Sequence, residues 1–383
     1  MKNIHFLVKP ASSLCNLRCR YCFYADEAQN RERPDMGSMS GETARTLIEE
    51  GFRWIEPGGT ISFAFQGGEP MVAGLPFFEG FVALARKLCP AGVKLSFSIQ
   101  TNGTLLDEAW AEFFHREHFL VGISLDGFKE NHNLYRLDAQ GGETWNQVVK
   151  AAALLQKHRV EVNALCVVTG QCAKRPERAY RELKKLGFDY LQFIACLDPI
   201  GAQRGHQPFS LTPSAYGRFL CRLFDLWYQD WEQGQYHSIR LFDDYIHILL
   251  GDNASTCATC GNCGSYFVVE GDGSIYPCDF FVLDQWHMGT LGESTLPEMA
   301  AGERAAAFLQ WGREKPAECG SCRWGGICNG GCKNDWLQTA DGSHNYYCEA
   351  FKTLLDYAMP RMRRIAQAER IAAAQQLNIY RVC

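Results

Sequence analysis

Three cysteines near the start of the chain constrain what it can fold into more than any other feature. Cys15, Cys19 and Cys22 have three and then two residues between them, and they follow a short apolar run over 4–8. Three thiolates on one tight loop can hold three corners of a cubane iron–sulfur cluster, which leaves one iron open to a small molecule. The alternatives are a structural zinc loop that lacks a ligand, or three unrelated buried cysteines.

Composition narrows the class of protein. The 383 residues predict two domains with a large core. The net charge of −5 favours neither a nucleic-acid partner nor a membrane partner. No signal peptide and no apolar stretch of the ~20 residues that span a membrane is recognisable. Eighteen cysteines in such a chain indicate metal or cluster ligation in a reducing cytoplasm, in an anaerobe, rather than disulfides.

The first 235 residues alternate strand-like and helix-like segments. The predicted strands are 4–9, 60–66, 95–101, 119–125, 160–169 and 190–196, and the predicted helices between them are 41–56, 75–88, 106–116, 145–157 and 176–186. Ser40 is a candidate N-cap for the first helix. The alternation predicts an α/β fold with a parallel sheet, whose ligand-binding loops lie at the carboxyl ends of the strands.

Polar and glycine-rich motifs follow several of these strands. Gln66-Gly67-Gly68-Glu69-Pro70 ends the second strand, and glycine there lets the backbone approach a ligand closely. Gln100 lies near the end of the third strand, and Ser124 ends the fourth. Each motif could also be an ordinary turn, and we interpret them as ligand loops only because they accompany the cysteine loop.

The cysteines are densest between residues 257 and 348, where the helix–strand alternation is expected to stop. Eight of them divide into two sets of four, each suited to zinc or to a 4Fe–4S cluster: Cys257, Cys263, Cys278, Cys319, Cys322, Cys328, Cys332 and Cys348. Cys260 is left over, so the choice between Cys260 and Cys263 as a ligand stays open.

These motifs together resemble the anaerobic sulfatase-maturating enzymes of the radical S-adenosylmethionine superfamily. The resemblance includes the cysteine loop with Phe23 and Tyr24 after it, the Gln-Gly-Gly-Glu-Pro motif, and Tyr276-Pro277-Cys278-Asp279-Phe280. It implies a partial (β/α)6 TIM barrel over 1–235, a SPASM domain over 236–350 and a helical segment over 351–383.

The resemblance also implies the cofactors. Cys15, Cys19 and Cys22 would hold a 4Fe–4S cluster whose open iron binds S-adenosylmethionine. The residues implied for S-adenosylmethionine itself are Tyr21, Gly68, Ser124, Arg136 and Leu197. Two auxiliary 4Fe–4S clusters would follow the intertwined SPASM pattern, with Cys257, Cys263, Cys278 and Cys332 on the first and Cys319, Cys322, Cys328 and Cys348 on the second.

The implied activity is oxidation of a Cys or Ser in a sulfatase polypeptide, within Cys/Ser-x-Pro/Ala-x-Arg, to Cα-formylglycine. A 5′-deoxyadenosyl radical would take a hydrogen from Cβ, and Asp279 would accept the thiol or hydroxyl proton. We expect burial beside an anionic cluster to raise the pKa of Asp279. Tyr24, Gln66 and Gln100 are candidate substrate contacts, and a reducing donor such as flavodoxin or ferredoxin is expected.

Two other classes remain open from the sequence. A radical enzyme that installs a thioether or carbon–carbon crosslink in a precursor peptide would share the same cofactor machinery. A non-catalytic electron carrier or a zinc-stabilised binding protein would share only the cysteines. The cysteines outside these sets are expected to pack as small apolar residues: Cys89, Cys166, Cys172, Cys196, Cys221 and Cys383.

Overall fold

The computed structural model describes residues 1–264, 266–340 and 342–380. The chain forms two compact units that interleave along the sequence. Unit 1 is Met1–Cys166, Leu197–Gln203 and Gly264–Trp311, and unit 2 is Val167–Cys196, Arg204–Cys263 and Gly312–Cys383. The sequence-based ranges 1–235, 236–350 and 351–383 remain a prediction of the family's domains.

Unit 1 is built on a parallel sheet. Its strands are β1 (Asn3–Val8), β2 (Thr60–Phe65), β3 (Lys94–Thr101), β4 (Leu120–Ser124) and β5 (Glu161–Val168). Each pairs in parallel with the next in this order. The predicted strands are therefore confirmed to within one or two residues, and so is the predicted α/β class.

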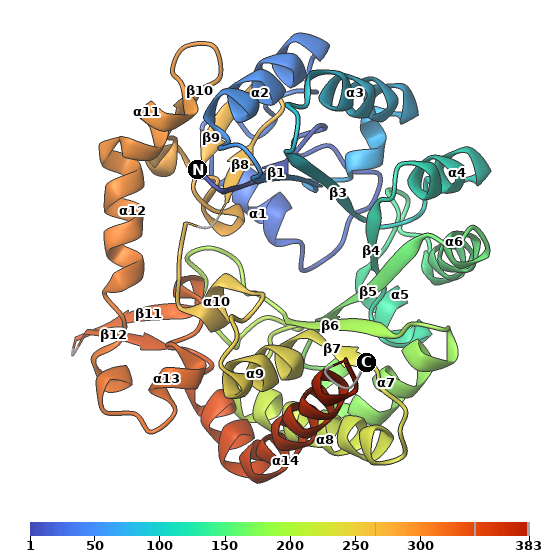
Figure 1. Cartoon of the computed structure of the whole chain (residues 1–383), viewed down its shortest axis with the longest axis vertical. Coiled ribbons are helices and arrows are strands. Elements are labelled where there is room, and N and C mark those ends of the chain that lie inside the picture. Colours follow the sequence, from blue (N-terminus) through green and yellow to red (C-terminus); the bar gives the residue numbers. More distant parts are fainter. Residues whose placement is uncertain (265, 341, 381–383) are drawn as a thin grey trace. The chain divides into compact units, whose positions relative to one another are not determined.

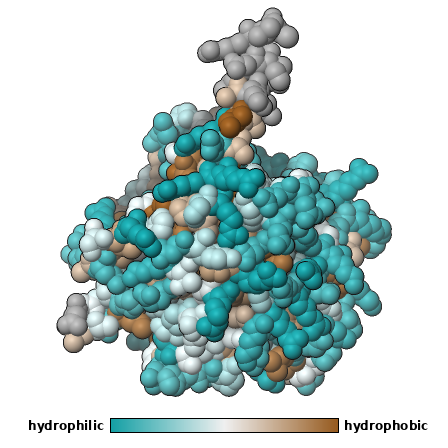
Figure 2. Space-filling view, turned by 90° about the horizontal axis from the view of Figure 1, so that it is seen from below, coloured by the Kyte–Doolittle hydropathy of each residue, from teal (hydrophilic) through white to brown (hydrophobic). Residues whose placement is uncertain are grey.

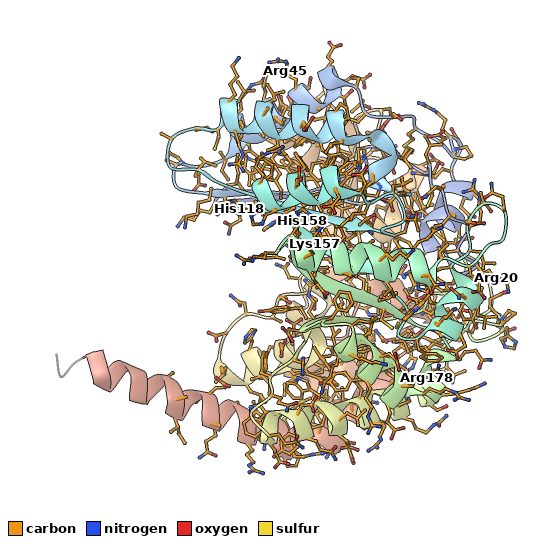
Figure 3. The ribbon with its side chains drawn as sticks, turned by 90° about the vertical axis from the view of Figure 1, so that its right-hand side faces the viewer. Arg20, Arg45, His118, Lys157, His158 and Arg178 are labelled. Carbon is orange, nitrogen blue, oxygen red and sulfur yellow. The ribbon has the colours of Figure 1, made fainter. Side chains whose placement is uncertain are left out.

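Helices follow the strands of unit 1, as the alternation predicted. They are α1 (Phe23–Gln29), α2 (Gly41–Trp54), α3 (Leu75–Leu88), α4 (Glu108–Arg116), α5 (Lys129–Tyr135) and α6 (Trp145–Lys157), with a 3-10 turn at Pro70–Ala73. Figure 1 shows α2 and α3 beside each other. Ser40 caps α2 by accepting from the Thr43 amide, as expected. In Figure 3, Lys157 and His158 mark the end of α6, where Lys157 Nζ lies 2.8 Å from Glu108 Oε1 of α4.

The core between the sheet and α3 is aromatic. Phe65 of β2 contacts Phe78 of α3 edge to face, with ring centroids 4.9 Å apart, and Phe63 contacts Phe81 in the same way at 5.0 Å. All four rings are buried. Such edge-to-face pairs fix the helix against the sheet more specifically than aliphatic contacts do. This aromatic core supports the carboxyl ends of β1 and β2, where the site lies.

A late segment of the chain completes the sheet of unit 1, which the sequence did not predict. β8 (Phe267–Val269) pairs in parallel with β1, and β9 (Ser274–Tyr276) and β10 (Gly289–Thr290) continue the sheet antiparallel. Short 3-10 turns at Asp279–Phe281 and Asp284–Trp286 follow β9, and then come α11 (Leu296–Ala301) and α12 (Glu303–Arg313). Asp279 therefore lies in the same unit as the cysteine loop.

Unit 2 is mostly helical. It contains α7 (Pro176–Lys185), β6 (Tyr190–Ala195), α8 (Pro213–Glu232), β7 (Ser238–Ile239), α9 (Arg240–Leu250), α10 (Cys257–Cys260), α13 (Gly325–Cys328), β11 (Trp336–Thr339), β12 (Gly342–Asn345) and α14 (Cys348–Tyr380), with 3-10 turns at Cys172–Lys174, Ala317–Gly320 and Lys333–Asp335. The aromatic residues of α8 are core residues, since Phe219, Phe224 and Trp227 are buried. At Gly217 a Cβ would lie 3.3 Å from the Ala350 Cα, so glycine lets α14 approach α8 closely.

Three further expectations concern the polarity of the surface, membrane-spanning helices and the burial of the cysteines outside the ligand sets. On the face in Figure 2, hydrophobic residues are scattered among hydrophilic ones. No helix in the described ranges is long and apolar enough to cross a membrane. Cys166, Cys172 and Cys196 are buried as expected, whereas Cys89 and Cys221 are half-buried. Cys383 lies outside the described residues.

Candidate active site and cluster-binding cysteines

The cysteine loop connects β1 to α1. Cys22 is the N-cap of α1, where its sulfur accepts a hydrogen bond from the Ala25 amide at 3.4 Å. The Cys15 sulfur accepts from the Leu17 amide, also at 3.4 Å, and the Cys22 amide donates to the Cys19 carbonyl. These bonds fold the loop into a tight turn, so the three predicted ligand cysteines sit on one short segment.

The electrostatics of the loop fit a cationic occupant. Burial raises the pKa of Cys19 to about 12 and that of Cys15 to about 11, and the neighbouring thiols add to both shifts. Arg136 acts in the opposite direction on Cys19. Buried thiolates gathered in this way need a positive partner, and iron supplies one because ligation deprotonates a thiol outright. The donor set therefore fits an iron–sulfur cluster.

Gly68 brings the end of β2 against the cysteine loop. A Cβ at this position would lie 2.1 Å from the Leu14 carbonyl oxygen, so only glycine fits. The Gly68 amide donates to the Ser12 carbonyl, and the Glu69 amide donates to the Leu14 carbonyl, both at 2.8 Å. Gly68 was predicted to bind the cofactor. The structure adds a second reason for glycine at this position, which is the close backbone contact with the loop beside Cys15.

Glu69 ties the same loop to the third strand. Its buried carboxylate accepts from the Met71 amide at 3.0 Å, the Asn102 amide at 2.7 Å and the Thr101 hydroxyl at 2.8 Å. Burial raises the pKa of Glu69 to about 7, although these three donors oppose the shift. Glu69 had no predicted role beyond the motif, and in the structure its carboxylate joins the ends of β2 and β3.

Tyr21 and Arg136 meet at Asp126. The Tyr21 hydroxyl donates to Asp126 Oδ2, and Arg136 Nε donates to the same oxygen at 3.0 Å. Burial raises the pKa of Tyr21 well above its usual value. The sequence proposed Arg136 for a methionyl carboxylate and gave Asp126 no role. Asp126 could have been identified from the sequence, because it belongs to the polar motif Ser124-Leu125-Asp126-Gly127, which begins at the last residue of β4.

The other residues proposed for S-adenosylmethionine lie at strand ends. Ser124 is the last residue of β4 and is half-buried. Leu197 follows β6 by two positions, belongs to unit 1 and is half-buried. Their positions agree with a ligand loop at the carboxyl edge of the strands.

Asp279 contacts two polar side chains that directly follow different strands. Lys9, directly after β1, places its Nζ 2.7 Å from Asp279 Oδ1, and both side chains are buried. Gln66, directly after β2, donates from Nε2 to Asp279 Oδ2 at 2.7 Å. The sequence proposed Asp279 and Gln66 separately, and the structure brings them into contact. Lys9 had no predicted role.

Tyr24 completes this cluster. Lys9 Nζ lies 3.5 Å from the centroid of the Tyr24 ring, a cation–π distance. The Tyr24 hydroxyl donates to Glu270, which also pairs with Arg31 at 2.9 Å. Gln100, the third candidate for substrate contact, lies in β3 with an exposed side chain.

Four cysteines of unit 2 line one pocket. Cys319, Cys322, Cys328 and Cys348 line this pocket together with apolar side chains such as Trp324 and Phe351. Burial raises the pKa of Cys328 to about 11, and each of the other three thiols adds to the shift. Among the described residues no three His, Cys, Asp or Glu side chains gather about a single metal ion. The four thiols that line this pocket are the set predicted for the second auxiliary cluster.

The other four-cysteine set is divided between the units. Cys257, Cys263 and Cys332 belong to unit 2, and Cys278 follows β9 in unit 1. After burial, the nearby thiol of Cys263 is the main cause that raises the pKa of Cys257. Cys260 is exposed and its sulfur donates to the Ala254 carbonyl at 2.8 Å. These contacts favour Cys263 over Cys260 as the partner of Cys257.

Comparisons with known proteins give the class first. Residues 10–183 match the family described as Radical SAM superfamily, and residues 257–323 match SPASM, described as an iron–sulfur cluster-binding domain. The fold and the two kinds of cysteine set thus define a radical S-adenosylmethionine enzyme with a SPASM domain.

The relatives give the family. A cysteine-type anaerobic sulfatase-maturating enzyme of Clostridium perfringens (strain 13 / Type A) is 44% identical over 96% of this chain and 99% of the relative. A serine-type enzyme of Bacteroides thetaiotaomicron is 32% identical over 94% of this chain and 91% of the relative. A solved structure, native anSMEcpe with bound AdoMet and Cp18Cys peptide, has a TM-score of 0.90 and 42% identity over 96% of this chain and 99% of that one.

The chain belongs to the anaerobic sulfatase-maturating enzymes. It is accordingly an oxidoreductase that uses S-adenosylmethionine and 4Fe–4S clusters, one of the radical-generating type and two auxiliary, and formylglycine formation fits this family. The predicted family, fold class, enzyme class and cofactors are confirmed.

Proposed function

We propose that this enzyme oxidises a cysteine within a Cys-x-Pro-x-Arg segment of a sulfatase polypeptide to Cα-formylglycine. The observation that carries the proposal is the contact of Asp279 with Gln66 and Lys9 at the strand ends that also hold the cysteine loop. The cysteine-type preference is supported by the higher identity to the cysteine-type relative, 44% against 32% for the serine-type one.

The proposed ligands follow the sequence assignment. Cys15, Cys19 and Cys22 hold the radical-generating cluster, and Tyr21, Gly68, Ser124, Arg136 and Leu197 bind S-adenosylmethionine. Cys257, Cys263, Cys278 and Cys332 hold the first auxiliary cluster, and Cys319, Cys322, Cys328 and Cys348 the second. The pocket of the last four is the strongest structural support among these assignments. A low-potential donor such as flavodoxin or ferredoxin supplies the electron, and we place the enzyme in a reducing cytoplasm.

The protein's own residues divide the chemistry between them. When bound, the cofactors would supply a 5′-deoxyadenosyl radical that removes a hydrogen from the substrate Cβ, and would take up the substrate's electron. Asp279 accepts the thiol proton, which leaves a thioaldehyde that water hydrolyses to the aldehyde with release of hydrogen sulfide. Tyr24, Gln66 and Gln100 contact the substrate.

The structure adds a partner to the sequence argument about Asp279. Lys9 Nζ lies 2.7 Å from Asp279 Oδ1, and both side chains are buried. An unpaired electron on Cβ makes the thiol on the same carbon more acidic, which favours transfer of its proton to Asp279.

The test uses the anaerobically reconstituted full chain with dithionite and S-adenosylmethionine. Peptides containing Cys-x-Pro-x-Arg or Ser-x-Ala-x-Arg are followed by mass spectrometry, with aldehyde trapped by a hydrazine, while chromatography follows 5′-deoxyadenosine. We expect aldehyde from the Cys peptide at a higher rate than from the Ser peptide. Asp279→Asn should lower the aldehyde yield about 100-fold or more while 5′-deoxyadenosine still forms. Deoxyadenosine with an unmodified peptide from the wild type would instead favour a crosslinking enzyme.

A further inference from the structure

Lys9 is a buried charged residue at the site that belongs to no motif and has been given no role in the chemistry so far. Its side chain is fully buried, and a lysine cation is costly to bury without a partner. Three groups face its ammonium. The Asp279 carboxylate lies at 2.7 Å, the Tyr24 ring lies with its centroid at 3.5 Å, and the charge of Glu27 acts on it from α1.

The backbone holds Lys9 rigidly at this position. The Lys9 amide donates to the Val269 carbonyl of β8 at 2.8 Å. Gly67 has φ +120°, and a Cβ there would lie 3.2 Å from the Lys9 Cβ and 3.3 Å from its Cγ. The first glycine of the Gly-Gly pair thus makes room for the lysine stem, just as Gly68 makes room for the cysteine loop. These contacts fix the backbone and the stem of Lys9 between β2 and β8, independently of the partners of its ammonium.

Glu27 is a second carboxyl near this cation. Its carboxyl is buried and accepts from the Val282 amide at 2.6 Å. Burial raises the pKa of Glu27 to about 8, while the charge of Lys9 opposes this shift and that of Asp279 adds to it. The ion pair at 2.7 Å is with Asp279, which is therefore the direct partner of the Lys9 ammonium.

The two oxygens of Asp279 are held by different residues. Oδ1 faces Lys9 and Oδ2 accepts from Gln66, so rotation of the carboxylate about its terminal bond would break one contact or the other. Two anchors on one carboxylate fix the direction in which its remaining lone pairs point. Fixing a reacting group in this way is worth much in rate, because small misplacements are costly.

From this geometry we propose that Lys9 is a positioning residue, which with Gln66 aims the Asp279 carboxylate at the substrate. The proposal rests on the proposed role of Asp279 as proton acceptor. It predicts that loss of the lysine charge disturbs the use of the substrate radical but not its formation. The quantity to measure is therefore the amount of formylglycine formed per 5′-deoxyadenosine, together with the deuterium transferred to deoxyadenosine from a Cβ-deuterated Cys peptide.

The experiment compares Lys9→Met, Lys9→Arg and Lys184→Met in the reconstituted full chain. We expect K9M to keep deuterium transfer and to lower formylglycine per deoxyadenosine about 10- to 100-fold. K9R, which keeps the charge, should recover part of the ratio. Lys184 is a matched control, because it also pairs with an aspartate, Asp230, and lies 5.0 Å from the centroid of a tyrosine ring, Tyr180, while none of these three residues belongs to the proposed site. K184M should keep the ratio within about twofold of wild type. Where K9M fails to load iron, Lys9→Gln answers the question by the same ratio.

A double-mutant cycle separates positioning from general support of the fold. K9M added to D279N should lower the ratio no further, because the group that Lys9 positions is already lost. An unchanged ratio in K9M, an equal fall in K184M, or a further fall of the same factor in the D279N background would each overturn the proposal. D279N with the wild-type ratio would overturn the proposed base itself, so the two failures can be told apart.

Discussion

The two cysteine sets that each lie within one unit are held in different ways. Cys15–Cys22 is a single loop with polar residues around it, such as Glu69 after β2, Asp126 after β4 and Arg136 after α5. The set from Cys319 to Cys348 is spread over a 3-10 turn, a short helix and the start of α14, and aromatic side chains help to line its pocket. The first offers three thiols and polar groups for a ligand, whereas the second offers four thiols and none of the strand-end motifs.

This difference in surroundings predicts different functions for the two clusters. A cluster with an open iron beside polar side chains can bind and activate a small molecule, whereas a cluster whose irons are all ligated by cysteine can only pass electrons. Figure 3 shows Arg20 of the first loop at the surface.

The following substitutions test the comparison between the two cysteine sets, in order of decreasing expected effect.

The largest effect is expected from Cys19→Ala. Loss of one thiolate from a three-cysteine loop should reduce 5′-deoxyadenosine to the level without enzyme and remove about four irons per chain. Anaerobic iron analysis and chromatography of the reaction measure both. Cys89→Ala is the control, since this half-buried cysteine of the same unit belongs to no proposed ligand set. Retained cleavage in C19A would mean that the two sets do not differ as proposed.

A smaller and qualitatively different effect is expected from Cys328→Ala. This change should also remove about four irons, but deoxyadenosine should still form while formylglycine falls about tenfold. Electron paramagnetic resonance of the reduced enzyme would show which cluster signal is lost. Cys221→Ala, at a half-buried position of the same unit, should change neither product. If C328A abolished deoxyadenosine as C19A does, the electron-transfer role would be wrong.

Gly68→Ala should distort the first region by overpacking. Because the new Cβ would meet the Leu14 carbonyl at 2.1 Å, the cysteine loop has to move, at a cost of about 1–3 kcal/mol in the free energy of unfolding. Gly80→Ala in α3 is the matched control. Its Cβ would meet nothing within 4 Å, and alanine should stabilise the helix by up to about 1 kcal/mol. Thermal unfolding of the iron-loaded variants gives both values, and opposite signs are expected.

The smallest effect concerns pH. Burial raises the pKa of Glu69 in the folded protein to about 7 from its usual 4.5. The folded state then binds more protons than the unfolded state between these values, so this group's contribution to stability falls as pH rises from about 4.5 to about 7. Glu69→Gln cannot ionise. Its melting temperature should fall less than that of the wild type between pH 5.5 and 7.5, and a parallel fall in both proteins would contradict the assignment.

Most of the fold of unit 1 was predictable because its signals are local. The helices 75–88 and 145–157 were predicted with the bounds that α3 and α6 have, since their apolar residues recur at helical spacing. β8 was missed for the opposite reason. A strand of three residues within a cysteine-rich segment shows no recognisable alternation of apolar and polar residues. Its partner β1 lies near the N-terminus, far from β8 in the sequence.

The candidate site was predictable as a set of residues but not as a set of contacts. The cysteine motif and its family resemblance pointed to Tyr24, Gln66 and Asp279 individually. Their joint partner Lys9 carries no motif of its own, and a lysine after a strand is usually solvated. Only the pairing of β1 with both β2 and β8 brings its ammonium to the Asp279 carboxylate.

That pairing has a consequence for how the protein is made. On the ribosome β1 and β2 emerge early, whereas β8 and Asp279 follow only after roughly 10 to 40 s of further synthesis, at about 5–20 residues per second. During this interval β1 is an unpaired edge that a chaperone or another nascent chain can engage. The cysteine loop is complete long before Asp279, the proposed proton acceptor, is synthesised. A chain that stops before β8 would therefore carry the proposed radical-generating segment without the residue proposed to accept the substrate's proton.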